Sequence, residues 1–455
     1  MERKYYDLTK GQRITFLSQK YTFNKEVNNI CTSILMEKEL DFGVLKAAIE
    51  KEYERNDALR IRVLKVDGEM KQYFEEYEKP SIEYLDFRGK TKEEMEEKLY
   101  KIASKSISVF GKPMSKVYLM HSCDGKCGIC FLVSHLLFDF WGVSVFYVDV
   151  LKVYEAMIKG EDMPKPLNPY EDLLVEELNY KNTERYIKDL EYFNKMIDEG
   201  EPVYNSINGY SVLEKYRKKK KNPNLGYANE FSIFQKGKHV DLPFPKDLVE
   251  RIESYCTANK LTMQSILFLA YRSYISKINK NEPDVSLTFI IAGRGTLKEK
   301  NTGGTRATFL PLRTIIEKDV AFKDACELID KKMMELYRHA SFDPMELILM
   351  RKSKFNAPAL SDYEGAVFSY QPERLVGPDG SRFEIKWYGN GISPAIFFLT
   401  IMDGGNSVGF NFNYEYQLHN VPYDTIEKMN SYMIKAVEAG ISKEGITIGE
   451  LLEIE

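Results

Sequence analysis

A histidine and an aspartate stand four positions apart in an otherwise apolar stretch, Ile129 to Gly142. His135 follows an uncharged run, and Asp139 lies among Leu, Phe and Trp residues. A buried carboxylate is costly unless it has a partner, so packing alone does not explain this pair. The stretch therefore predicts a functional site.

The carboxylate of Asp139 needs a cation, and arginine can meet a carboxylate with two parallel hydrogen bonds. Arg294 is the best candidate in the sequence, because it stands where an apolar strand at 285–291 ends in glycines. We predict that Asp139 and Arg294 form a structural pair that holds the turn. His135 then faces a cavity and handles the proton.

Ser134 precedes His135 and raises the possibility of a serine hydrolase. Adjacent strand residues point to opposite faces, so the two side chains would not meet. The segment Gly142-Val-Ser144-Val-Phe146 lacks the last glycine of a nucleophile elbow. We expect no serine nucleophile here.

Cys123, Cys127 and Cys130, with His121, have a spacing that resembles a metal or iron–sulfur ligand set. A hairpin with its turn at 124–125 would instead spread these residues along two paired strands. Cys130 would then be a buried small hydrophobe. We therefore expect no metal site.

Composition limits the function classes. The chain has 455 residues, is 29% charged and 44% hydrophobic, and is long enough for two or three domains. Its formal charge of −4 argues against nucleic acid as a partner. The polar start and the lack of an uncharged run of roughly 18 residues argue against secretion and a membrane partner. Six cysteines suggest no disulfide framework. Gly293-x-Gly295 lacks a third glycine, so we expect no nucleotide cofactor. We expect a soluble, cytoplasmic protein.

Helical and strand patterns alternate along the chain. We expect helices at 41–53, 91–104, 143–157, 171–197, 245–259, 262–278, 319–339 and from 427 onward. We expect strands at 28–36, 58–64, 70–74, 116–120, 128–133, 285–291, 309–316, 367–370, 383–387, 395–402 and 408–414. The strands at 116–120 and 128–133 pair as a hairpin, so His135 leaves the end of its second strand.

A connector with three prolines, 160–170, is the best domain boundary. Both sides mix helices and strands, so we expect an α+β protein with two lobes, 1–165 and 170–455. The basic run Lys215–Pro223 is expected to be a solvated loop, with docking of an acidic partner as the alternative.

Taken together, these residues resemble the condensation domain of nonribosomal peptide synthetases, in the superfamily that includes chloramphenicol acetyltransferase. The defining pattern His-His-x-x-x-Asp-Gly is occupied by Ser134-His135-Leu-Leu-Phe-Asp139-Phe140. Further segments resemble other motifs of the family, in the same order: Leu8–Arg13, Arg55–Arg62, Tyr170–Asp172 with Tyr192-Phe193, Gly293-Arg294, Thr308–Arg313 and His339–Pro344.

The resemblance implies two chloramphenicol acetyltransferase-like lobes in a V-shaped arrangement, with a tunnel between them and the SHxxxDF motif in the N-terminal lobe. The phosphopantetheine arms of two carrier proteins would enter this tunnel from opposite faces. His135 would orient or deprotonate the amine and steady the tetrahedral intermediate. Asp139, Arg294 and Ser134 would support the site, and the candidates to line the tunnel are Phe140, Trp141 and Gly142.

Two positions depart from the family pattern. Ser134 replaces the first histidine, as in the Ser-His form of the cyclising terminal domains of fungal synthetases, and it points away from the tunnel. Phe140 replaces the glycine, so a benzyl group there would narrow the tunnel or shift the turn.

The implied activity is condensation of a carrier-bound acyl or aminoacyl thioester with an amine to give an amide, with an ester as the less favoured product. No adenylation or carrier region is visible in the sequence, so we expect carrier proteins to act in trans. We expect no tightly bound cofactor. Two alternatives stay open: an acyltransferase that uses acyl-coenzyme A, and a catalytically degenerate domain that binds a partner protein.

Overall fold

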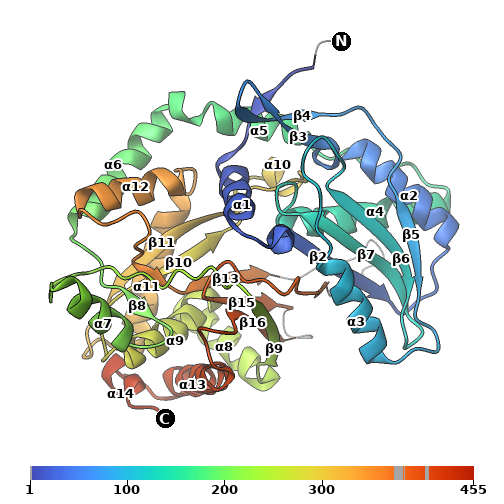
Figure 1. Ribbon diagram of the computed structural model, residues 1–455. Coiled ribbons are helices and arrows are strands. Elements are labelled where there is room, and N and C mark those ends of the chain that lie inside the picture. Colours follow the sequence, from blue (N-terminus) through green and yellow to red (C-terminus); the bar gives the residue numbers. More distant parts are fainter. Residues whose placement is uncertain (1–2, 373–382, 384, 405–408) are drawn as a thin grey trace. The chain divides into compact units, whose positions relative to one another are not determined.

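The computed structural model describes residues 3–372, 383, 385–404 and 409–455, which belong to two compact units (Figure 1). Unit 1 consists of Met1–Thr183, Ala292–Ala307 and Arg374–Ile392. Unit 2 consists of Glu184–Ile291, Thr308–Glu373 and Ser393–Glu455.

These units differ from the predicted lobes, 1–165 and 170–455. Unit 1 continues past the proline connector to Thr183, and it also takes in 292–307 and 374–392. The reason is tertiary, because Asp139 bonds to the first of these insertions and a strand of the second pairs with the sheet of unit 1. The V-shaped arrangement and the tunnel stay predictions.

Unit 1 is built on a five-stranded sheet in the order β14-β2-β7-β6-β5. The strands are β14 (Lys386–Trp387), β2 (Asn29–Met36), β7 (Cys127–Ser134), β6 (Ser115–His121) and β5 (Ile82–Asp86). β7 lies antiparallel to both β2 and β6. The predicted hairpin of β6 and β7 is confirmed, and its turn includes Gly125 with a φ of 85°.

Both faces of this sheet are covered by helices, which explains why β7 is apolar throughout. Ile129, Phe131 and Val133 pack in one core with α2 (Phe42–Arg55) and α4 (Phe140–Lys159). Cys130 and Leu132 pack on the opposite face with α3 (Lys92–Ala103). Alternate residues of a strand point to opposite faces, so a strand covered on both sides needs apolar residues at every position.

Further elements of unit 1 surround this sheet. A small sheet has the order β1-β4-β3. The remaining elements are β1 (Tyr6–Asp7), β3 (Ile61–Val66), β4 (Glu69–Phe74), α1 (Lys10–Tyr21), α5 (Tyr170–Leu178), α10 (Leu297–Lys300) and the 3₁₀ turns Lys25–Asn28, Asp57–Arg60 and Tyr180–Asn182. Asp67 and Gly68, between β3 and β4, both have positive φ, as is typical of a two-residue hairpin turn.

Unit 2 contains a six-stranded sheet in the order β11-β10-β13-β15-β16-β9 and a two-stranded sheet of β12 and β8 (Figure 1). The strands are β8 (Asn205–Ser206), β9 (Gly237–Pro243), β10 (Asp284–Ile291), β11 (Thr308–Ile315), β12 (Glu364–Gly365), β13 (Val367–Pro372), β15 (Phe397–Asp403) and β16 (Phe410–Gln417). The helices are α6 (Glu184–Asp198), α7 (Ser211–Lys220), α8 (Lys246–Asn259), α9 (Met263–Ile278), α11 (Phe322–Arg338), α12 (Pro344–Lys354), α13 (Tyr423–Ser442) and α14 (Ile448–Leu452). One apolar core joins the large sheet to α8, α9, α11 and α13.

Several sequence predictions are corrected by these elements. The single helix expected at 171–197 is two helices, α5 and α6, separated by a 3₁₀ turn. The basic run expected to be a loop is largely helical, since α7 extends to Lys220. The strands β5 and β9 and the helix α12 were not predicted. The strands expected at 383–387 and 408–414 each include residues outside the described part of the chain.

Candidate functional site

The backbone around His135 is held from two sides. The N–H of Ser134 donates to the carbonyl of Met114 at 2.9 Å, and the N–H of His135 donates to the carbonyl of Asn28 at 2.7 Å. The chain therefore leaves β7 with its direction fixed before the turn begins.

Ser134 closes the turn that follows β7. Its side chain is buried, and its hydroxyl oxygen accepts a hydrogen bond from the N–H of Leu136 at 3.3 Å. Its carbonyl accepts from the N–H of Leu137 at 2.9 Å. These contacts involve Ser134 in the local geometry of the turn, and its role in supporting the site stays a prediction.

His135 is half-buried. Its Nδ1 is sealed from solvent and has no hydrogen-bond partner among the residues that the structure describes. Because Nδ1 is closed to solvent, Nε2 is the ring nitrogen that remains for contact with a substrate. Burial lowers the pKa of His135, and the opposing influence of the Asp139 charge is smaller. The ring is thus neutral at neutral pH.

Asp139 is the N-cap of α4 and is almost completely buried, with 2% of its surface exposed. Its Oδ1 accepts from the N–H of Gly142 at 2.8 Å and from Nη2 of Arg294 at 3.3 Å. Its Oδ2 accepts from the N–H groups of Arg306 at 2.6 Å and Ala307 at 2.8 Å. Burial tends to raise the pKa of Asp139, but Arg294 and these N–H groups together outweigh it and lower the pKa. The carboxylate is therefore ionised and has four donors.

The predicted contact between Asp139 and Arg294 is present, across 155 positions of the sequence. The side chain of Arg294 is fully buried. Besides Asp139, its guanidinium donates to three carbonyls, those of Glu299 at 2.9 Å, Thr302 at 2.8 Å and Gly304 at 2.7 Å. Arg294 therefore connects Asp139 to the loop that carries Arg294 itself, and it also holds the backbone of that loop together.

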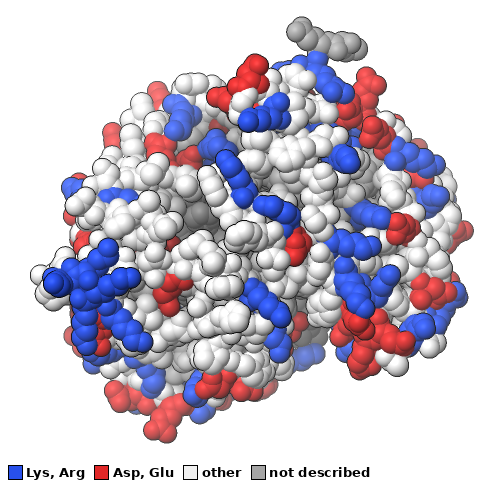
Figure 2. Space-filling view, in the orientation of Figure 1, with Lys and Arg blue, Asp and Glu red and all other residues white. Residues whose placement is uncertain are grey.

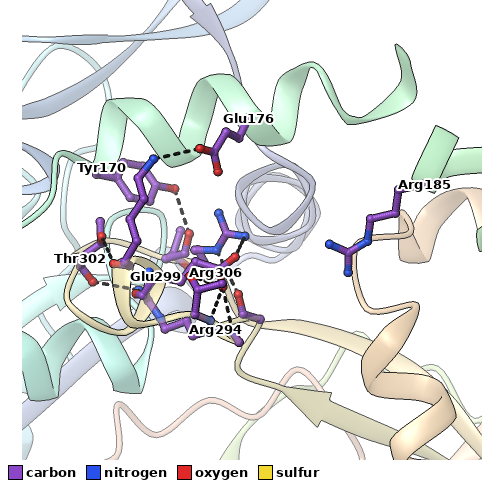
Figure 3. Close-up of polar contacts among 12 residues, drawn as sticks. Tyr170, Glu176, Arg185, Arg294, Glu299, Thr302 and Arg306 are labelled. Carbon is purple, nitrogen blue, oxygen red and sulfur yellow. Dashed lines mark hydrogen bonds and ion pairs between the residues drawn. The ribbon is translucent and has the colours of Figure 1, made fainter. Parts of the chain in front are cut away.

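Figure 3 shows Glu299, Thr302 and Arg306 of the loop Ala292–Ala307 beside Arg294. Arg306 donates from Nε to the carbonyl of Gly293 at 3.1 Å and from Nη2 to Oε1 of Glu299 at 3.1 Å. Glu299 in turn closes a capping box with Thr296 at the start of α10. These residues were missed in the sequence, although the Thr-x-x-Glu capping pattern was visible there.

Two glycines allow the loop to approach α4 closely. A Cβ on Gly142 would lie 2.4 Å from the carbonyl oxygen of Gly304. Gly304 itself has a φ of +81°, and a Cβ there would lie 2.4 Å from the ring of Tyr170. The hydroxyl of Tyr170 donates to the carbonyl of Thr305 at 2.8 Å (Figure 3). The loop is therefore held by Tyr170 of α5 as well as by its own residue Arg294.

Trp141 also contacts this loop, since its Nε1 donates to the carbonyl of Lys300 at 3.0 Å. Gly142 is buried against the loop. The contacts of both residues are thus explained within unit 1, and their predicted role in lining a tunnel stays a prediction.

Phe140 is the first residue of α4 and is half-buried. Its ring stacks on Trp387, with 5.7 Å between the ring centroids and 23° between the planes. Trp387 lies in β14 opposite Thr32 of β2, and its Nε1 is buried without a partner in the described residues. The benzyl group that departs from the family pattern is therefore packed in unit 1, and the Asp139 cap forms in its presence.

Among the described residues, Cys123, Cys127 and Cys130 do not form a metal-binding group with His121. Cys130 is buried, with its sulfur 3.9 Å from that of Cys31. His121 instead contacts the hydroxyl of Tyr84 through Nδ1 at 2.8 Å. In the described part of the chain, no group of three or more His, Cys, Asp or Glu side chains is arranged to hold a metal ion. Nor does any helix there have the length and apolar character needed to cross a membrane.

Comparison with known proteins gives a consistent result. The model of the condensation domain family matches residues 2–444. A plipastatin synthase subunit of Bacillus subtilis (strain 168) is 21% identical over 454 residues, covering 99% of this chain and 17% of the relative. Surfactin synthase subunit 1 of the same strain is 22% identical over 461 residues, covering 99% of this chain and 12% of the relative. The chain thus spans about a sixth or less of the length of these relatives.

Solved structures with the same fold are also condensation domains. The first condensation domain of the CDA synthetase has a TM-score of 0.81 at 15% identity, covering 98% of both chains. VibH, an NRPS condensation enzyme, has a TM-score of 0.73 at 15% identity, covering 94% of this chain and 95% of VibH. A variant of the starter condensation domain of rhizomide synthetase in complex with C8-CoA has a TM-score of 0.80 at 15% identity, covering 99% and 98%. The α+β architecture with a chloramphenicol acetyltransferase-like fold is thereby confirmed.

Proposed function

Because this chain belongs to the condensation domain family, we propose that it forms an amide bond between a carrier-protein-bound acyl or aminoacyl thioester and an amine. The observation that carries the proposal is a neutral, half-buried His135 at the end of a fixed strand. The residues that hold this strand end and the following turn are already engaged in structural contacts. His135 is therefore the group of this motif best suited to proton transfer.

The proposed role of His135 depends on its protonation state. A neutral imidazole can accept a proton, whereas an imidazolium cannot. Because burial lowers the pKa of His135, the neutral form prevails at neutral pH. With Nδ1 buried, Nε2 is the nitrogen that can receive the proton of the substrate amine.

The proposed reaction balances without another reactant. The amine nitrogen attacks the carbonyl carbon of the thioester while Nε2 of His135 accepts the amine proton. The tetrahedral intermediate collapses, the C–S bond breaks, and the proton passes to the leaving thiolate. The products are an amide and a free thiol. A well-placed base of this kind accelerates such a step by roughly 10²–10⁴-fold.

Asp139, Arg294 and Ser134 are positioning residues in this proposal. Each contacts backbone or side-chain groups of unit 1, and the four donors around Asp139 leave it ionised. Asp139 therefore fixes the turn that follows His135 and does not itself exchange protons during the reaction.

The thioester donor is proposed to be carried on phosphopantetheine. Coenzyme A ends in the same thiol-bearing arm. The starter condensation domain of rhizomide synthetase has the same fold as this chain, and the structure of one of its variants contains C8-CoA. An acyltransferase that uses acyl-coenzyme A is therefore the second candidate function.

An amide-forming assay with both donors tests the proposal. The same acyl group is offered on a carrier protein and on coenzyme A, with an amine acceptor, and the amide is measured by mass spectrometry. His135→Ala should lower the rate by roughly 10²-fold or more with whichever donor is used. His419→Ala, which changes an exposed histidine of unit 2, should keep the wild-type rate.

Each outcome has a distinct consequence. Product from coenzyme A but not from the carrier protein would favour the second candidate function. Absence of product from both donors would favour a domain that only binds a partner. Wild-type rates in His135→Ala would refute the assignment of the proton-handling group.

The pH profile provides a further readout. The rate should fall as the pH drops through the pKa of His135, below the usual value of about 6.5, because protonation removes the acceptor. A profile that already falls above that value would contradict a lowered pKa for the essential group.

A further inference from the structure

A concentration of positive charge lies at the C-terminal end of α7, in a chain whose formal charge is −4. Figure 2 shows Lys and Arg side chains crowded over α7 at the left of the view. We name the exposed lysines of this region the lysine patch: Lys215, Lys218, Lys219, Lys220 and Lys221. The chain's overall composition does not account for such a gathering.

The helix that bears the lysine patch is fixed to unit 2. Leu213 is buried in a small apolar cluster with Tyr204 and Ala228. Arg217 donates from Nε to the carbonyl of Leu225 at 2.8 Å and from Nη1 to the hydroxyl of Tyr210 at 3.2 Å. The lysines are therefore presented on an ordered element, so a partner that binds them loses less conformational entropy than it would with a flexible tail.

Most of the charge in the lysine patch is not neutralised by unit 2. Lys218 comes within 3.8 Å of Glu214, and Lys220 lies 5.8 Å from the ring centroid of Tyr216. Among the described residues, no other ion pair involves these five lysines. One or two cations are enough to complement the dipole of a helix C-terminus. The remaining lysines repel one another, and an oppositely charged partner would remove that repulsion.

The side chains around the lysine patch favour a protein as the partner. The exposed positions within 211–224 are held by Ser, Lys, Asn and Pro. They include no large apolar group of the kind that enters a lipid surface. The negative overall charge of the chain disfavours a nucleic acid. Carboxylates on the surface of another protein would complement the patch.

We propose that the lysine patch is the docking surface for the carrier protein that delivers the thioester, and that this carrier presents an acidic face to α7. The inference rests on the proposed function, which requires a carrier protein to bind and leave in each cycle. Charged contacts at the edge of an interface speed association and keep it reversible. They suit a carrier of this kind better than a permanently bound protein.

A binding experiment tests the surface independently of catalysis. Fluorescein-labelled poly-L-glutamate serves as an acidic probe, and its anisotropy is followed as sodium chloride is raised. The patch variant is K215E/K218E/K219E/K220E. The control variant makes the same change in net charge at exposed lysines elsewhere, K46E/K92E/K98E/K331E.

The patch variant should bind the probe about tenfold more weakly or worse at low salt, and the control variant within about threefold of wild type. Glutamate at a helix C-terminus interacts unfavourably with the helix dipole and could destabilise α7. Circular dichroism therefore checks that the patch variant is folded. The variant K215Q/K218Q/K219Q/K220Q repeats the test with neutral residues. Equal probe affinity in the patch and control variants would overturn the proposal. Tighter binding to phosphatidylglycerol vesicles than to the probe would also overturn it.

Catalysis then identifies the occupant. The same acyl group is offered on an acidic carrier protein and on coenzyme A, which lacks a protein surface. The patch variant should raise the KM for the carrier-borne donor about tenfold and leave the KM for coenzyme A unchanged. An unchanged KM for the carrier-borne donor would overturn the assignment of the carrier. If the wild type uses neither donor, the proposed function fails, whereas the probe experiment still decides whether the surface exists.

Discussion

Replacing Asp139 with asparagine removes one negative charge from the centre of unit 1 while nearly preserving the size of the side chain. In the wild type, the carboxylate accepts from the N–H groups of Gly142, Arg306 and Ala307 and from the guanidinium of Arg294. An asparagine side chain has one acceptor oxygen and one NH2 group. Whichever way it is turned, at least one N–H donor of the protein faces another donor.

The cost follows from the burial of the pair. Removing one partner of a buried ion pair typically costs about 3–5 kcal/mol, because the other charge is left uncompensated. Arg294 keeps its hydrogen bonds to three carbonyls, so we expect the lower end, about 3 kcal/mol of unfolding free energy at neutral pH.

Urea unfolding followed by circular dichroism measures this loss. Asp86→Asn is a matched control, because Asp86 also pairs with an arginine, Arg88, but the two side chains are 39% and 59% exposed. An exposed pair is worth about 0–1 kcal/mol, so the control should remain close to wild type. An Asp139→Asn protein within about 1 kcal/mol of wild type would refute the argument that the buried pair braces the turn.

The pH dependence checks the same reasoning. Burial acts against ionisation, but Arg294 and the backbone donors prevail, so the pKa of folded Asp139 is lowered. The stabilisation is therefore fully present above the unfolded-state pKa of about 3.9 and is lost as the pH falls through the folded-state value. The difference between wild type and Asp139→Asn should narrow on acidification over this range. A difference that stays constant would show that the lost charge is not its cause.

Two further substitutions test other buried contacts of unit 1. Gly304→Ala should lower the melting temperature, by an amount equivalent to about 1–3 kcal/mol of unfolding free energy, because the new methyl group meets the ring of Tyr170. The control is Gly391→Ala: Gly391 has a similar positive φ but open space around it, so the melting temperature should fall clearly less. Equal falls in melting temperature would contradict the steric argument. Burial and the neighbouring Asp149 raise the pKa of Glu52, so wild-type stability should be present at low pH and decline as the pH rises through that raised value. Glu52→Gln should remove this decline in melting temperature as the pH rises above about 4.3, the usual pKa of glutamate, and an identical decline in both proteins would refute the assignment.

Local sequence patterns determined much of unit 1. The uninterrupted apolar run of β7 and the turn at Gly125 predicted the hairpin that ends at His135, because a strand with helices on both faces needs apolar residues on both. The same logic identified Arg294 as the partner of Asp139, since a carboxylate in an apolar stretch requires a buried cation. The pair was predictable because its chemistry leaves few alternatives.

Helix boundaries in the charged segments were less accessible. The basic run Lys215–Pro223 was expected to be a loop, but its first six residues form the C-terminal part of α7. Lysine and arginine favour helices, and Leu213 is the one buried residue of α7. The helix expected at 171–197 is interrupted by a 3₁₀ turn at Tyr180–Asn182, which the periodic pattern did not reveal. Both differences arise where few apolar residues define a face.

What the sequence by itself determined is the motif: a histidine at a strand end, an aspartate four positions later, and an arginine to neutralise that aspartate. Only the tertiary structure decided that the loop 292–307 belongs to unit 1 and supplies Asp139 with two backbone donors besides Arg294. Only the tertiary structure, too, packed Phe140 on Trp387. The physical reason is that the sequence identifies the side chain at each position, whereas nearly every residue has the same backbone N–H group. Which of these N–H groups bind one carboxylate is decided only when the chain folds.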